Sequence, residues 1–247
     1  MDWRALLAPY QDRLIKSLQG CISFPSVYAD DGSGFPYGQA AQDCLNYMLK
    51  LSADMGFSIG NCDNHVGWCE YGQSDEMVAV LGHLDVVPAG EGWSVDPYGG
   101  VVKDGRLYGR GAIDDKGPLV AALYALLALK DAGLPMKRRV RILYGLNEEL
   151  GSNDMKYYRS HGGEIPVMGI TPDGEYPVVN GEKGLVTAFY DCKPQQTGPI
   201  RLVSMAGGAA QQAAQHVAAA LVGGQNAVGD HEGGGADMVG DDTQGHI

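Results

Sequence analysis

Residues 109–117 read GRGAIDDKG and lead into an apolar run from Leu119 to Leu129. Because the run is rich in alanine and leucine, it predicts a buried helix that begins just after the pair Asp114 and Asp115. A turn at a helix N-terminus stabilises carboxylates and points backbone N–H groups toward a bound group. An isolated Asp-Asp pair is more often an N-cap beside a solvated acid, so the role of this turn depends on the segments around it.

Three apolar segments that we predict to be buried strands each end in residues that can bind a metal ion. They are Met77–Leu81 followed by His83 and Asp85, Val140–Leu146 followed by Glu148 and Glu149, and Val167–Ile170 followed by Asp173. Unbroken apolar runs are typical of strands covered on both faces in a parallel or mixed sheet. Strands that alternate with helices predict an α/β fold, and such sheets bind ligands at the carboxyl ends of their strands.

The rest of the pattern predicts a mixed, largely parallel sheet flanked by helices. We expect helices over 3–20 (ended by Gly20), 39–56, 117–132, 152–160 and 209–222, strands over 66–71 and 185–192, and a hairpin over 101–108. Residues 223–247 are dominated by glycine and small residues without apolar periodicity, which predicts a low-complexity, disordered tail.

Composition limits the partners. The 247 residues are 45% hydrophobic, and a net charge of -12 argues against nucleic acid and anionic membranes as partners. The five cysteines include no C-x-x-C pair; Cys62 and Cys69 could be bridged, but free thiols in a reducing compartment are the better expectation. With no signal-peptide pattern at the N-terminus and no apolar run of about 18 residues, we expect a cytoplasmic protein that spans no membrane.

The spacing of the polar residues has a chemical logic. Residues two apart in an extended chain point the same way, so Asp85 could orient the imidazole of His83, although a histidine at a strand end satisfied by its neighbour is also common. Adjacent Glu148 and Glu149 cannot both face one ion; one could bind it while the other acts on a water, or both could be acids at a solvated helix start. One histidine with several carboxylates suits a zinc-type ion, and a carboxylate can bridge two.

Four motifs carry a resemblance to a known family. They are GHLDVVP at 82–88, GRGAIDDKGP at 109–118, NEELGS at 147–152 and TPDGEYP at 171–177. In this order and spacing they resemble the co-catalytic zinc metallopeptidases, a family of aminoacylases, carboxypeptidases and dipeptidases. The similarity covers about residues 5–205 and is closest to the PepV-type dipeptidases, because DDKGP at 114–118 and NGEKG at 180–184 accompany Pro172 and Asp173. The related deacylases usually have a glutamate where this chain has Asp173.

The resemblance implies a catalytic centre with two zinc ions, for which manganese or cobalt could substitute. The implied metal ligands are His83, Asp114, Glu149 and Asp173, with Asp114 as the bridge between the ions. The implied catalytic residues are Glu148, as general base and later acid, and Asp85, which orients His83. The family also has a cis peptide bond between Asp114 and Asp115, and the PepV type acts on dipeptides, including β-alanyl ones.

The resemblance also implies how the chain is organised. We expect residues 1–190 to form the N-terminal part of a catalytic domain, residues 191–222 to begin an incomplete lid domain, and residues 223–247 to form the tail. A final histidine ligand and the rest of the sheet would belong to the family's second half, so we expect a truncated chain with impaired dipeptidase activity and a sheet edge that invites association.

Three other functions are compatible with the sequence. The chain could be an N-acyl-amino-acid deacylase of the same family. It could be an inactive metal-binding fragment, or a subunit that a partner completes. An α/β domain without metal would require all four motifs to be coincidences.

Overall fold

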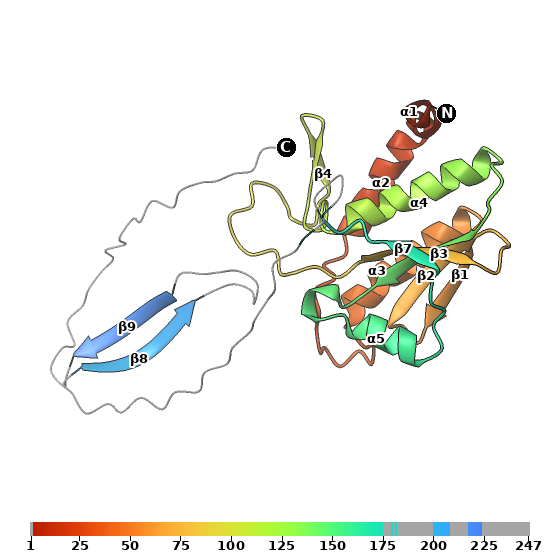
Figure 1. Ribbon diagram of the computed structural model, residues 1–247. Coiled ribbons are helices and arrows are strands. Elements are labelled where there is room, and N and C mark those ends of the chain that lie inside the picture. The colour runs from red at the N-terminus through yellow and green to blue at the C-terminus, as the bar shows by residue number, and fades with distance from the viewer. Residues whose placement is uncertain (1, 175–178, 180, 182–199, 208–216, 224–247) are drawn as a thin grey trace. The chain divides into compact units, whose positions relative to one another are not determined.

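The computed structural model describes residues 2–174, 179, 181, 200–207 and 217–223 (Figure 1). The chain divides into two compact units, residues 1–184 and 185–247. The first unit contains the mixed sheet and the helices; within the described part of the second, β8 (Ile200–Gly207) pairs antiparallel with β9 (Val217–Gly223).

The sheet of the first unit has five strands in the order β1-β2-β6-β3-β7. These are β1 (Ser58–Cys62), β2 (Val66–Tyr71), β3 (Met77–His83), β6 (Arg139–Gly145) and β7 (Met168–Ile170). β3 runs parallel to both β6 and β7, whereas the β1–β2 and β2–β6 pairs are antiparallel. The predicted α/β fold is therefore confirmed, with the parallel strands next to the residues expected to bind a ligand.

Helices cover both faces of the sheet. The helices of this unit are α1 (Trp3–Leu7), the 3-10 helix η1 (Ala8–Tyr10), α2 (Gln11–Ile22), α3 (Gln39–Asp54), α4 (Lys116–Asp131), the 3-10 helix η2 (Glu148–Leu150) and α5 (Asn153–Ser160). Alternate residues of β6 point to opposite faces: Ile142 and Tyr144 join the main core with α2, α3 and α4, while Leu143 joins a smaller core with Tyr158 of α5. Figure 1 shows α4 and α5 on opposite sides of the sheet.

A short hairpin precedes α4. Strands β4 (Val101–Lys103) and β5 (Arg106–Tyr108) pair antiparallel, as the sequence predicts. The turn residues Asp104 and Gly105 both have positive φ, 51° and 74°, which is the conformation that a two-residue hairpin turn needs.

Three predicted elements differ from the structure. The helix over 3–20 is interrupted by η1, which contains Pro9, a residue without a backbone N–H. Gly20 does not end this helix but lies inside α2, where it admits the ring of Tyr47; a Cβ at Gly20 would lie 2.3 Å from the Tyr47 hydroxyl oxygen. The helix predicted over 209–222 is wrong for residues 217–222, which pair with β8 as part of a strand, while residues 209–216 lie outside the described residues.

The burial expected for Val167–Ile170 is wrong as well. β7 is an edge strand among the described strands, and Val167, Met168 and Ile170 are about 60% exposed. The strand predicted over 185–192 and residues 224–247 of the tail predicted over 223–247 lie outside the described residues, and Gly223 is the last residue of β9. None of the helices in the described residues has the length and the apolar character that a membrane span requires.

The main core generates a prediction about stability. Leu123 of α4 is fully buried, so Leu123→Ala should lower the free energy of unfolding by about 2–5 kcal/mol through lost burial and a cavity. Val102→Ala, at a half-exposed position of β4, should change it by less than about 0.5 kcal/mol. Urea unfolding of both variants tests the placement of α4; equal effects would contradict it.

Candidate metal centre

The centre lies at the carboxyl ends of the parallel strands. The β3–β6 register pairs His83 with Gly145, so the chain that leaves β6 reaches Glu148 and Glu149 beside the end of β3. On the other side of β3, Val80 pairs with Ile170, and three residues later the chain reaches Asp173. Parallel pairing thus brings residues that lie far apart in the sequence together at the carboxyl ends of the strands.

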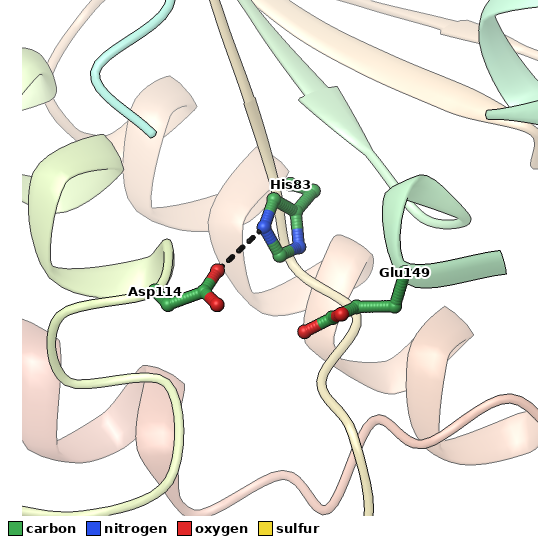
Figure 2. A group of neighbouring side chains, drawn as sticks. All are labelled: His83, Asp114 and Glu149. Atoms are coloured by element: carbon green, nitrogen blue, oxygen red, sulfur yellow. Dashed lines mark hydrogen bonds and ion pairs between the residues drawn. The ribbon is translucent and has the colours of Figure 1, made fainter. Parts of the chain in front are cut away.

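His83 is at the centre of the group. Its Nε2 lies 2.9 Å from Asp114 Oδ1, 3.6 Å from Asp173 Oδ2 and 4.0 Å from Glu148 Oε2. Figure 2 shows the carboxylates of Asp114 and Glu149 on either side of the His83 ring. Two sets of side chains offer ligand atoms within 4.8 Å of one another: His83 with Asp114 and Glu149, and His83 with Glu148 and Asp173. The structure therefore brings the four expected ligands and the expected base together.

Asp85 contacts this group in two ways. The Nδ1 of His83 lies 2.9 Å from the backbone carbonyl oxygen of Asp85 and 3.3 Å from its carboxylate Oδ1. The buried carboxylate also accepts hydrogen bonds from the backbone N–H groups of Glu148 (3.2 Å) and Glu149 (3.1 Å). When Nδ1 carries the proton and donates a hydrogen bond to the carbonyl oxygen, Nε2 has a free lone pair that faces the carboxylates. Asp85 thus links the imidazole to the segment that carries the two glutamates.

The crowding of carboxylates changes the pKa values. Burial alone would lower the pKa of His83, but hydrogen bonds with Asp114 and Asp85 raise it to about 11. Burial raises the pKa of Glu149 to about 7, with a further contribution from the Asp114 carboxylate, and burial also raises the pKa of Glu148. In contrast, the hydrogen bond with His83 lowers the pKa of Asp114. A divalent cation would relieve this repulsion, and an imidazole nitrogen with carboxylate oxygens is a donor set that zinc accepts.

The structure also shows two buried acids that the sequence analysis did not assign. Asp115 is fully buried and bonds to the backbone of His83. Asp154, in the first turn of α5, accepts hydrogen bonds from the backbone N–H groups of Leu146 (2.6 Å) and Asn147 (3.0 Å). In the sequence Asp154 looks like any acid near a helix N-terminus, so only the fold reveals its partners. The Asp114–Asp115 peptide bond is cis, as the resemblance implies.

Comparison with known proteins places the chain in a family. The sequence model of peptidase family M20/M25/M40 matches residues 79–239. The chain belongs to this family. Among curated relatives of this M20 chain, YtjP of Bacillus subtilis (strain 168) is 38% identical over 203 residues, and the Beta-Ala-Xaa dipeptidase of Lactobacillus delbrueckii subsp. lactis is 34% identical over 200 residues.

The coverage of these relatives is partial. The matches include 81% and 80% of the M20 chain but only 44% and 42% of YtjP and of the Lactobacillus protein. The crystal structure of human carnosine dipeptidase 1 superposes with a TM-score of 0.59 at 23% identity, covering 70% of this chain and 41% of the human one. The chain therefore shares the fold of these proteins and spans less than half of their length.

The shifted pKa values predict how the stability of the metal-free protein depends on pH. The folded state holds a proton on His83 up to about pH 11, and on Asp115 and Glu149 up to about pH 7, whereas the unfolded state releases these protons earlier. The stabilisation from His83 is complete below its unfolded pKa of about 6.5 and is lost as the pH rises toward 11. Urea unfolding in EDTA should show a free energy that falls by about 1 kcal/mol per pH unit near pH 8. His83→Gln should flatten this slope; a flat wild-type profile would contradict the prediction.

Proposed function

We propose that the chain carries the metal centre of a dipeptidase, which hydrolyses the amide bond of small peptides. The observation that carries the proposal is that two sets of possible ligands share His83 at the carboxyl ends of the strands, one with Asp114 and Glu149 and the other with Glu148 and Asp173. A relative named as a Beta-Ala-Xaa dipeptidase and a structural neighbour named as a carnosine dipeptidase support dipeptides as the substrate class.

The ligand atoms favour zinc, with manganese or cobalt as substitutes. By the resemblance, His83, Asp114 and Asp173 would hold one ion, and Asp114 and Glu149 would hold another; the structure supports this by placing Asp114, Asp173 and Glu149 each near the His83 imidazole. When bound, such ions polarise a scissile carbonyl group and lower the pKa of water. A cavity of about 290 Å³ lined in part by His83, Glu148 and Asp173 gives a small ligand room beside these residues.

Glu148 is suited to move the proton. Its side chain is 48% exposed, yet its backbone N–H is fixed by the buried carboxylate of Asp85, so the carboxylate can reach a substrate from a held position. Partial burial raises its pKa, which brings a carboxylate closer to the pKa that suits a general base. Glu148 would accept a proton from the attacking water and return it to the nitrogen of the leaving amine.

The partial coverage of the relatives favours a second candidate: a metal-binding chain without hydrolytic activity of its own. The chain spans 44% of YtjP, so residues of the unmatched part could be needed for turnover. Zinc binding without hydrolysis of any dipeptide would establish this candidate. Faster hydrolysis of N-acyl amino acids than of dipeptides would instead establish a deacylase.

The free cysteines support the cytoplasmic location that the sequence predicts. The thiols of Cys21 and Cys44 form a hydrogen bond, with their sulfur atoms 3.7 Å apart, and no disulfide bond; Cys62 and Cys69 are also free thiols. Reduced thiols in close proximity suit a reducing compartment. Fractionation of the cells that make the chain, followed by detection of the chain in the cytoplasmic fraction, tests this location.

Substitution of Glu148 tests its role in hydrolysis. With zinc added, Glu148→Gln should reduce the hydrolysis of a β-alanyl dipeptide by about 10²–10⁴-fold, because the amide cannot accept the proton. Asp12→Asn, an exposed position on α2, is the control and should keep the wild-type rate. Equal rates for Glu148→Gln and wild type would remove Glu148 as the base.

The edge strand β7 supports association with another chain. Its exposed apolar side chains, on a strand that lies at the edge of the sheet among the described strands, form a surface onto which a further strand can add. Met168→Lys should shift the sedimentation of the chain toward the monomer, whereas Val102→Lys, on the hairpin, should not. A wild-type chain that sediments as a monomer at every concentration would contradict association through β7.

A further inference from the structure

Asp115 has an unusual position for a charged residue. It follows the expected bridging ligand Asp114 directly, and it occupies the N-cap position of α4 without capping the helix through its side chain. The residue is fully buried, and burial raises the pKa of its carboxyl group to about 7. Burying a carboxylate costs free energy unless hydrogen bonds or opposite charges compensate it.

The contacts of Asp115 point to the end of β3. Its Oδ2 accepts a hydrogen bond from the backbone N–H of His83 at 3.2 Å. This approach requires glycine at position 82, because a Cβ there would lie 2.1 Å from the same oxygen and 2.7 Å from Leu119 Cγ. The other oxygen, Oδ1, is buried and has no hydrogen-bond partner in the described part of the chain. Of the two carboxylate oxygens of Asp115, Oδ2 therefore makes the hydrogen bond to the His83 backbone.

This hydrogen bond joins the two elements that carry neighbouring ligands. His83 comes from the end of β3, and Asp114 comes from the turn before α4; their ligand atoms lie 2.9 Å apart. From this geometry we propose that Asp115 is a positioning residue, which holds the backbone of His83 so that His83 and Asp114 together present their ligand atoms to a metal ion. The inference rests on the proposed metal centre.

A similar arrangement occurs at the next strand. The carboxylate of Asp154 holds the backbone at the end of β6, and a Cβ at Gly145 would lie 2.8 Å from its Oδ2. In both parallel strands a glycine near the carboxyl end makes room for a buried carboxylate from the following helix. This recurrence supports a role for both buried carboxylates in fixing the carboxyl ends of the strands, where the expected ligands lie.

The proposal requires an acceptor oxygen at position 115 but no charge, which separates it from direct metal binding. Asp115→Asn keeps an oxygen that can accept the His83 N–H, whereas Asp115→Ala removes it. Zinc titration of the full chain by calorimetry should give a dissociation constant for Asp115→Asn within about threefold of wild type. Asp115→Ala should weaken zinc binding by about 10–100-fold, as other residues that orient metal ligands do.

Folding is monitored separately by circular dichroism and urea unfolding in EDTA. If Asp115→Ala does not fold, Asp115→Ser replaces it. The serine hydroxyl lies one bond closer to the backbone than the carboxylate oxygen, so this variant also removes the acceptor from its position beside the His83 N–H. Wild-type zinc affinity in a folded Ala or Ser variant would overturn the role of Asp115 but not the proposed metal centre. A tenfold loss of zinc affinity in Asp115→Asn would do the same. Failure of the wild-type chain to bind zinc would overturn the proposed metal centre and this inference with it.

Discussion

The parallel pairing of β3 with β6 and β7 is the constraint on which the rest of the structure depends. A parallel sheet turns sequence distance into spatial proximity, because each strand delivers its following residues to the same edge. Here the register sets His83 level with Gly145, and each strand is followed by acids within a few residues. The helices serve this arrangement: α4 covers one face of the sheet and brings Asp114 from its preceding turn.

The electrostatics of the edge follow from that convergence. Several carboxylates share a partly buried space with one imidazole, and the pKa values of His83 and Glu149 rise, so that both groups favour the protonated form, which reduces the repulsion. A divalent cation would also reduce this repulsion, so the arrangement is well suited to a cation. The family membership and the ligand geometry support the same kind of centre from independent directions.

Much of this could be predicted from the sequence, because long apolar runs and short polar motifs are local signals. The run from Leu119 to Leu129 lies in α4, and the pairs at the strand ends meet as expected. The errors concern long-range context. The role of Gly20 inside α2 depends on the ring of Tyr47, and the exposure of β7 depends on which strands lie beside it. Asp115 was missed because its partner, a backbone N–H, leaves no mark in the sequence.

The contact between Asp85 and His83 affects how mutagenesis at this site is interpreted. The shorter of the two contacts comes from the main chain of Asp85, which every amino acid possesses. An alanine scan would therefore leave the carbonyl acceptor of the ring in place, while releasing the amides of Glu148 and Glu149. A defect in such a variant would report on the glutamate-bearing segment more than on the histidine tautomer, so a side-chain scan understates what position 85 does for the ring.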